Sequence, residues 1–283
     1  MTNLEREEAI ASALVRGSTS YRDDQMRAWC RALEAEANPR ARWVLEQIVE
    51  NAETAEQRSL RLCDDTGVPH LILEIGRNEP LDAGLLDAIQ RGVAQGMRRL
   101  PGRPMAVVGD DIQRLEQSQG LAEDPAALVP APISMCTMEE AGVRLHILMQ
   151  GGGPEIRGKT YRVFHQHKLS VLLDEITAWA QEASALLGCT PCTPAIGIGR
   201  SHFEATSLML DAMAHGNFDV QSDLEREITD RINAATVGPL GLGGNTTALA
   251  TFLKIGPQRA SGVRIVCLRL CCCVEPRVAS VLL

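Results

Sequence analysis

The chain has 283 residues, a formal net charge of −8 and 45% hydrophobic residues, a composition typical of a soluble globular protein with a sizeable core. The acidic balance argues against a nucleic-acid-binding surface. No apolar run is long enough to span a bilayer, and the acidic N-terminus is neither a secretory signal nor an arginine-rich transit peptide, so we expect a cytoplasmic protein with reduced cysteines.

Hydrophobic periodicity predicts an α/β fold class, with helices packed around a small mixed sheet. We expect a single domain spanning residues 1–283, of which residues 1–60 form a helical N-terminal part broken at Asn38-Pro39. Residues 110–125 are polar and predict a surface excursion. The other expected elements are strands at 68–75, 143–149 and 262–270, and helices at 81–99, 169–187, 202–215 and 223–232.

Residues 63–67 read Cys-Asp-Asp-Thr-Gly, between a helical segment and an apolar run. Asp, Thr and Gly all weaken helices, so the stretch predicts a tight turn that carries polar groups toward the interior. One interpretation is a metal ligand, Cys63, beside a general acid or base, Asp65. The other is a capped turn with a buried cysteine, which is the commoner case for such a stretch taken alone.

A glycine segment, residues 151–153, follows the strand expected at 143–149. Three glycines allow a ligand to approach the backbone closely and offer unhindered N–H donors, although the segment lacks the spacing of a P-loop or a dinucleotide fingerprint. The basic stretch after it, residues 157–168, is either an anion site or the surface of a helix entry. It contains His165 and His167, which on a strand would share a face; a two-histidine metal site there has no third ligand nearby.

The cysteines with the most suggestive surroundings lie at three distant places: Cys63, the pair Cys189 and Cys192, and residues 271–273. The Cys-x-x-Cys pair fits a redox centre or half of a zinc site, but no second pair completes a zinc site and the surroundings are not those of thioredoxin-like motifs. Three consecutive cysteines cannot all face one point. A cubane iron–sulfur cluster held by three cysteines leaves one iron open to act as a Lewis acid.

A further candidate is Arg103, on a stiff loop with prolines on both sides. An arginine can bind a carboxylate with two parallel hydrogen bonds, which lysine does less well. The alternative is a solvated loop charge, and that is the commoner case.

Six stretches, in this order along the chain, resemble the alpha subunit, or N-terminal domain, of class I fumarases and L(+)-tartrate dehydratases. Each is modest alone, but together they span nearly the whole chain. The stretches are Asn38-Pro39 with the helix after it, residues 63–67, residues 151–155, Cys192-Thr193-Pro194 with Gly197 and Gly199, residues 238–249, and Cys273 with Arg277.

This resemblance implies a [4Fe-4S] hydro-lyase that acts on a small 2-hydroxy dicarboxylate such as malate, with Cys63, Cys192 and Cys273 as the cluster ligands. Spacing from the preceding segment favours Cys271 as the third ligand instead. The resemblance further implies proton transfer by Asp65 and substrate binding by Arg103 and Gly152. It also implies a beta subunit on a separate chain and hence a hetero-oligomer.

Two departures from the family pattern leave a rival interpretation open. Arg259-Ala260 stands where the family usually has His-Pro, and the tryptophan that follows the third cysteine is absent. The rival is a non-catalytic scaffold that binds an iron–sulfur cluster or zinc. Among enzymes, fumarate hydration is the main expectation and tartrate dehydration its near alternative, because the glycine segment resembles the fumarase form slightly more.

Overall fold

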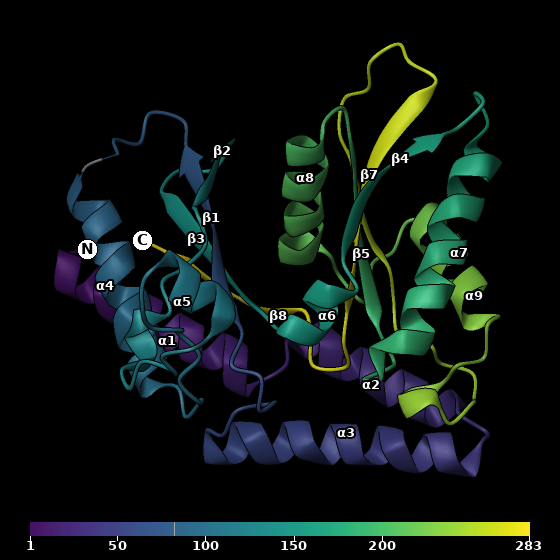
Figure 1. The fold of residues 1–283 in the computed structure, drawn as a ribbon, viewed down its shortest axis with the longest axis horizontal. Helices are drawn as coiled ribbons and strands as arrows, with labels where there is room; N and C mark the ends of the chain where they lie inside the picture. The colour runs from purple at the N-terminus through teal and green to yellow at the C-terminus, as the bar shows by residue number, and fades with distance from the viewer. Residues whose placement is uncertain (82) are drawn as a thin grey trace. The chain divides into compact units, whose positions relative to one another are not determined.

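The computed structural model describes residues 1–81 and 83–283, and these form two compact units (Figure 1). Unit 1 comprises Met1–Ser20, Thr54–Gly151 and Arg277–Leu283, and unit 2 comprises Tyr21–Glu53 and Gly152–Pro276. Each unit contains one small four-stranded sheet in which parallel and antiparallel pairs are mixed. The predicted α/β class is therefore confirmed, and the assignment of residues 1–283 to one domain stays a prediction.

Unit 1 has a sheet with the strand order β2-β1-β3-β8, in which only the β1–β2 pair is parallel. Helix α3 (Pro39–Arg58) begins in unit 2 and ends in unit 1. The other elements of unit 1 are α1 (Asn3–Thr19), α4 (Ala83–Arg99), α5 (Asp111–Glu116), η1 (Pro125–Ala127), β1 (Val68–Gly76), β2 (Ser134–Met138), β3 (Val143–Gln150) and β8 (Arg277–Leu282).

Helices α1 and α4 cover one face of the unit 1 sheet with aliphatic side chains. Leu71 and Leu73 of β1 alternate with residues that point to the opposite face, and they join Leu145 of β3 in one buried cluster. Leu14 of α1 and Ile89 of α4 complete this cluster from the helices. Burial of each of these side chains contributes roughly 1.5–3 kcal/mol.

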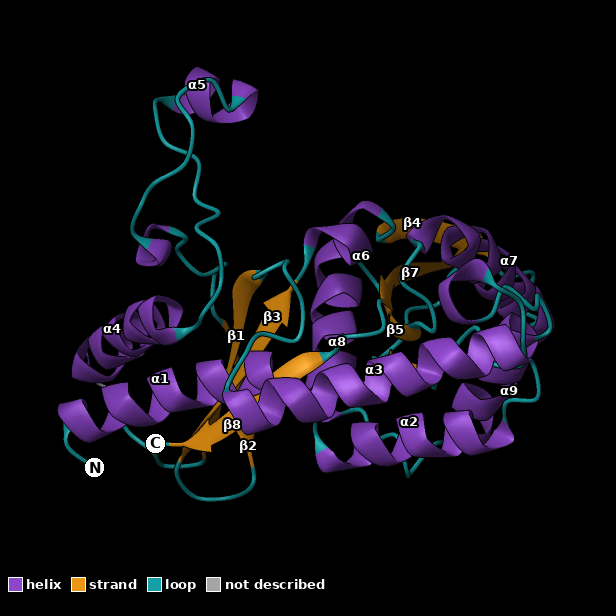
Figure 2. Ribbon diagram, turned by 90° about the horizontal axis from the view of Figure 1, so that it is seen from below, coloured by secondary structure: helices purple, strands orange, loops and turns teal. Residues whose placement is uncertain are grey.

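Residues 104–123 leave the sheet as an exposed arm that carries α5, away from the strands in Figure 2. A bridge between Val107 and Leu121 closes the base of the arm. The polar surface excursion predicted at 110–125 is confirmed, whereas its short helix was not predicted.

Unit 2 repeats the strand arrangement of unit 1, with the order β4-β7-β5-β6 and only the β5–β6 pair parallel. In both units one strand (β1 or β5) is followed by helices and then by a strand that pairs with it in parallel (β2 or β6). The next strand (β3 or β7) pairs with the first strand on its other side in the antiparallel direction. The elements of unit 2 are α2 (Asp23–Ala35), α6 (Gly152–Ile156), α7 (Leu169–Leu187), α8 (His202–His215), α9 (Asp223–Asn233), η2 (Pro239–Gly241), β4 (Lys159–Phe164), β5 (Thr193–Gly199), β6 (Phe252–Ile255) and β7 (Val263–Cys271).

Helices α7 and α9 lie on one side of the unit 2 sheet and α8 on the other (Figure 1). Ile196 and Ile198 of β5 point into the cluster under α7 and α9. Gly197, between them, faces α8, where a Cβ atom would lie 2.0 Å from the carbonyl oxygen of Ala205. The Gly-Ile-Gly pattern thus exists because the backbone of α8 lies directly on this strand.

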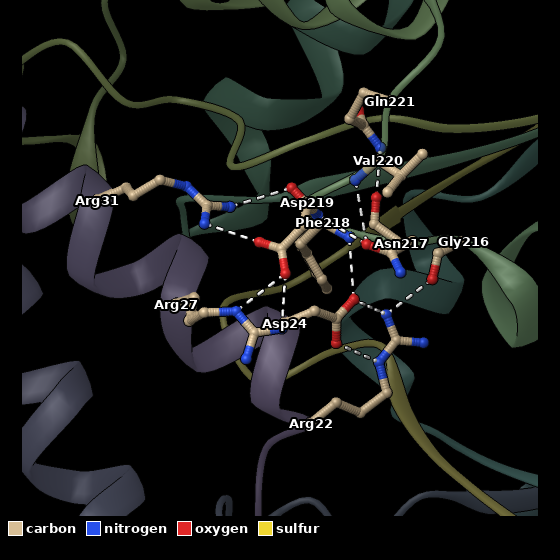
Figure 3. Close-up of polar contacts among 10 residues, drawn as sticks. All are labelled: Arg22, Asp24, Arg27, Arg31, Gly216, Asn217, Phe218, Asp219, Val220 and Gln221. Carbon is tan, nitrogen blue, oxygen red and sulfur yellow. Dashed lines mark hydrogen bonds and ion pairs between the residues drawn. The ribbon is translucent and has the colours of Figure 1, made fainter.

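Helix α2 is attached to the loop after α8 by ion pairs, shown in Figure 3. Arg27 Nη2 and Arg31 Nη1 contact the carboxylate of Asp219 at 2.6 and 2.7 Å. Asp24 accepts a hydrogen bond from the backbone N–H of Phe218 at 2.9 Å. These contacts fix the segment from 216 to 221 against the helix.

Most predicted elements are confirmed to within one residue at either end, namely those at 68–75, 143–149, 169–187, 202–215, 223–232 and 262–270. The N-terminal part is helical, with the expected break at Asn38 and a second, unpredicted break at residues 20–22. The helix expected at 81–99 is α4, and Asp82 lies outside the described residues. Strands β2, β4 and β8 were not predicted. Within the described ranges, none of the helices has both the length and the apolar composition to cross a membrane.

The ion pairs of Asp219 predict an acid-sensitive part of the stability. Hydrogen bonds from Arg27 and Arg31 lower the pKa of Asp219. Their stabilising contribution is therefore complete above the ordinary carboxyl pKa and is lost as the pH falls through the lowered value. We expect Asp219→Asn to lower the melting temperature at pH 7 and to melt like the wild type in strong acid. Asp230→Asn, at an exposed position of α9, is the control; an equal loss at both pH values would contradict the assignment.

Candidate functional site

The six residues singled out from the sequence fall into two groups, one in each unit. Cys63, Asp65 and Arg103 belong to unit 1, and Cys192, Cys273 and Gly152 belong to unit 2. The chain passes between the units four times, and the last two of these passages are between Gly151 and Gly152 and between Pro276 and Arg277. These two passages lie within a few residues of the candidate site positions Gly152 and Cys273.

In unit 1, the side chain of a buried arginine stabilises the turn of residues 63–67. Arg277, at the start of β8, is 4% exposed, and its Nη1 donates to the carbonyl oxygens of Asp65 and Thr66 at 2.7 and 3.2 Å. Its Nε donates to the carbonyl oxygen of Met149 at the end of β3, at 3.1 Å. One guanidinium therefore satisfies three carbonyls and joins the turn to two strands.

Gly67 ends this turn with a φ of +82°, a conformation that side chains with a Cβ rarely adopt. A Cβ atom there would also lie 2.6 Å from Nη2 of Arg277 and 3.1 Å from the backbone of Gln150. The glycine in this motif is therefore required both by the turn and by the close approach of Arg277.

Asp65 lies half-buried on the same turn, and its Oδ1 accepts a hydrogen bond from the backbone N–H of Gly67 at 3.1 Å. The carboxylate therefore supports the turn in the way that Asp side chains often do. The geometry is compatible with Asp65 both as a residue that supports the turn and as a general acid or base, because one carboxylate has two oxygens and can accept several hydrogen bonds.

Arg103 is positioned by its backbone, while its side chain extends into solvent. The Thr66 hydroxyl accepts a hydrogen bond from Arg103 N–H and donates one to the Arg103 carbonyl, each at 3.1 Å. The guanidinium is half-exposed and lies 3.4 Å from Asp64, which Arg61 also contacts at 2.8 Å. Because both side chains of the Arg103–Asp64 pair are largely exposed, this ion pair is weak.

In unit 2, Cys192 and the three-cysteine segment meet at one end of the sheet. Thr193, the first residue of β5, pairs with Cys271, the last residue of β7, in the antiparallel ladder. Cys192 is fully buried, and burial raises the pKa of its thiol to about 12. Such a thiol does not suit the redox interpretation of the Cys189–Cys192 pair, since redox-active cysteines have lowered pKa values.

Within the segment 271–273, exposure to solvent increases along the chain. Cys271 is 0% exposed, Cys272 is 9% exposed and Cys273 is half-buried. The backbone of Cys273 is fixed by two hydrogen bonds, from its N–H to the carbonyl of Cys189 and from the hydroxyl of Tyr21 to its carbonyl, each at 2.9 Å. Cys273 is thus the most accessible thiol of the three, held on a defined backbone.

The glycine-rich loop of residues 238–249 supports Cys192. The backbone N–H of Cys192 donates to Thr247 at 2.8 Å, and the Cys192 carbonyl accepts from Leu249 at 2.8 Å. The loop is anchored in turn by Glu36, a 4% exposed carboxylate that accepts from the N–H groups of Asn38 and Asn245 at 2.9 and 2.8 Å. The Asn38-Pro39 motif and the glycine-rich motif therefore act together to place one cysteine.

Gly152 begins α6, a helix of five residues, and is exposed, whereas Gly151 before it is buried. The exposed part of the glycine segment therefore begins at Gly152. Glu155, the last residue of the motif, forms an ion pair with Arg269 of β7.

The two-histidine metal site considered for the basic stretch does not fit the geometry. His165 is 7% exposed; its Nε2 lies 2.9 Å from the carbonyl of Ser261, and its Nδ1 accepts from the N–H of His167 at 3.1 Å. Both ring nitrogens are therefore engaged with backbone groups, which makes His165 a structural residue.

Sequence reasoning missed Glu36, Thr247, Arg269, Glu275 and Tyr21 as supports of the site. Thr247 stands inside a recognised motif, but its function depends on which backbone group it meets. Glu36 and Tyr21 are far in sequence from the cysteines that they support. Arg269 and Glu275 flank the segment 271–273, but nothing in the sequence distinguishes them from other charged residues.

Comparisons with known proteins identify the class to which this chain belongs. The family model for fumarate hydratase (Fumerase) matches residues 7–281, so the chain belongs to this family. The putative L(+)-tartrate dehydratase subunit alpha of Methanocaldococcus jannaschii is 28% identical over 244 residues, which is 82% of each chain. The L(+)-tartrate dehydratase subunit alpha of Escherichia coli K12 is 20% identical over 269 residues, covering 91% of this chain and 84% of the relative. The resemblance inferred from the motifs is confirmed, and the protein is a hydro-lyase.

The close approach at Gly67 gives a direct test of the turn. We expect Gly67→Ala to lower the free energy of unfolding by about 1–3 kcal/mol, because the new Cβ meets Arg277 and the backbone is strained at positive φ. Denaturant unfolding of the purified chain measures this change. Gly262→Ala is the matched control, since a Cβ there meets nothing within 4 Å and its φ is not positive. Equal stability of the two variants would show that the turn adapts.

Proposed function

We propose that the chain is the cluster-bearing alpha subunit of a [4Fe-4S] hydro-lyase that interconverts fumarate and malate or dehydrates L(+)-tartrate. The observation that supports this proposal is the position of the predicted ligands at the ends of strands. Cys63 lies on the turn before β1, Cys192 directly precedes β5, and the segment 271–273 begins at the last residue of β7. The family model supports fumarate as substrate, and the names of the curated relatives support tartrate.

Cysteine thiolates are the usual ligands of an iron–sulfur cluster, which supports this proposal. Cys63 and Cys192 would each supply one thiolate, and Cys273 the third, as the most exposed residue of its segment. The raised pKa of Cys192 means that its thiolate forms only with a compensating cation, which a cluster iron provides. When bound, the cluster supplies an open iron that polarises the substrate hydroxyl as a Lewis acid.

The residues of the chain would perform the remaining steps. Arg103 binds one substrate carboxylate in place of Asp64 and fixes its orientation. Gly152 would let the substrate approach the backbone closely, because it has no side chain. In dehydration, Asp65 would take the proton from the carbon beside a substrate carboxylate, and the hydroxyl would leave as hydroxide and take up a proton from solvent to form water. The proton on Asp65 would then pass to solvent, and in the hydration direction Asp65 would donate a proton to that carbon.

The cluster assignment predicts a defined composition. Anaerobic reconstitution should give close to four irons and four sulfides per chain, the stoichiometry of a cubane. Cys63→Ser and Cys192→Ser should each lose most of this iron, and Cys30→Ser, at an exposed position on α2, is the control that should keep it. Full iron content in both ligand variants would refute the assignment, and turnover of fumarate under anaerobic conditions separates the enzyme from the non-catalytic scaffold.

Asp65 is expected to carry proton transfer. Asp65→Asn retains the hydrogen bond to the Gly67 N–H through its side-chain oxygen, so the turn should remain intact. We expect full iron content and a decrease of turnover by about a hundredfold or more, the usual scale for a lost general acid or base. Initial rates with fumarate and with L-tartrate measure the effect. Wild-type rates would leave Asp65 as a residue of the turn only.

We further propose that the chain needs a beta subunit on a separate chain. Both relatives named above are called alpha subunits, and a dicarboxylate must be held at both ends for its reacting carbon to stay in attack geometry. Anaerobic assays of the chain, alone and co-expressed with a beta subunit, should show activity only in the second case. Full activity of the lone chain would contradict the divided site and would require the second carboxylate-binding group within the basic stretch 157–168.

A further inference from the structure

A buried ion pair spans the three-cysteine segment of unit 2. Arg269 precedes the segment by two residues and Glu275 follows it by two; they are 2% and 0% exposed on their side chains. Arg269 Nη2 lies 3.4 and 3.2 Å from the two carboxylate oxygens of Glu275. The two ends of the segment are therefore joined by a contact that is excluded from water.

The pair fixes the conformation of the cysteines between its members. The backbone N–H of Glu275 donates to the Cys272 carbonyl at 2.9 Å, which closes a turn. Arg269 itself is held in the sheet, because it pairs with Ala195 of β5 in the ladder. The position of the turn relative to the strand is thus set by the guanidinium as well as by the backbone.

The same guanidinium also reaches the glycine segment. Its Nη1 contacts the carboxylate of Glu155 on α6, three residues after Gly152. A planar guanidinium can bind two carboxylates in fixed directions, whereas the compact ammonium of lysine cannot reproduce this arrangement. A buried arginine is expensive to desolvate, and removing one partner of a buried ion pair is strongly destabilising because it leaves an uncompensated charge.

We propose that Arg269 is a positioning residue that presents the third cysteine ligand and, through Glu155, holds the glycine segment beside it. The ion pair with Glu275 fixes the conformation of the cysteine segment. The ion pair with Glu155 holds the glycine segment at which Gly152 is proposed to bind substrate. This inference rests on the proposed function only for the nature of the bound group. The conformation of the cysteine segment can be tested without any cluster.

The first experiment maps thiol alkylation by iodoacetamide in the anaerobic apo chain, with mass spectrometry. Arg269→Met should make Cys271 and Cys272 react about tenfold faster or more, since the local structure that buries them is loosened. Cys267, which lies in the middle of β7 and is 4% exposed, should keep its rate and so reports the sheet itself. Arg269→Lys keeps the positive charge but can contact only one of the two carboxylates, so the alkylation rates of Cys271 and Cys272 should increase by a smaller factor. This variant provides the test if Arg269→Met does not fold.

Arg231→Met is the matched control. Arg231 also bridges two carboxylates in unit 2, Asp174 and Glu227 at 2.8 and 2.6 Å, but on helices α7 and α9. It should leave the rates of Cys271 and Cys272 unchanged. Wild-type alkylation rates in both Arg269 variants, or an equal increase in the control, would overturn the positioning role.

The second experiment separates the two links of the guanidinium in the reconstituted enzyme. Arg269→Met should retain less than about half of the wild-type iron and sulfide, because one ligand is misplaced. Glu155→Gln should keep the full iron content and raise KM about threefold or more with kcat unchanged, since it loosens substrate binding alone. Normal iron content in Arg269→Met would refute the inference, whereas a wild-type chain that takes up no iron would refute the proposed function and leave the alkylation result standing.

Discussion

The candidate site depends on the antiparallel pairing of two strands in each unit. In unit 1, β1 follows Cys63 and pairs with β3; in unit 2, β5 follows Cys192 and pairs with β7. Val68 at the start of β1 pairs with Gln150 at the end of β3, and Thr193 at the start of β5 pairs with Cys271 at the end of β7. Because antiparallel strands bring the start of one beside the end of the other, the cysteine turn and the returning segment meet in each unit. A shift of register by one residue would move every side chain on these strands to the other face.

Each unit stabilises this meeting point with a different buried group. In unit 1, Arg277 satisfies the carbonyls of the Cys63 turn, and in unit 2, Glu36 and Thr247 fix the loop that holds Cys192. The guanidinium of Arg277 donates hydrogen bonds to the carbonyl groups of the turn. The carboxylate of Glu36 accepts hydrogen bonds from backbone N–H groups of the loop, so in each unit the charged side chain is complementary to the backbone groups that it contacts. Buried polar groups of this kind hold the backbone on which the candidate site residues lie.

Regular elements with clear periodicity could be predicted from the sequence because burial alone determines them. Helix α7 and strand β1 are examples, and their predicted ends agree with the structure. Strand β8 could not be predicted in the same way, since its six residues gain their partner only when β3 is already in place. The motifs around Cys63 and Cys192 could likewise be recognised from residue types and order.

What the sequence could not give is which distant groups hold those motifs. Glu36 lies 209 residues from Asn245, and Arg277 lies 212 residues from Asp65, so neither contact has a local signature. Nor does the sequence rank three adjacent cysteines. Their difference in exposure follows from the end of β7 and from the contacts of Tyr21 and Cys189 with the backbone of Cys273.

The burial of Cys192 has a consequence for the chain before any cofactor is inserted. Oxidants attack the thiolate rather than the thiol, and a thiol with a pKa of about 12 is almost entirely protonated at neutral pH. Under the cluster assignment proposed above, insertion would release a proton, because the thiol would ionise as it binds iron. The newly made chain would then keep Cys192 as an unreactive thiol, and an acidic medium would oppose cluster insertion by mass action.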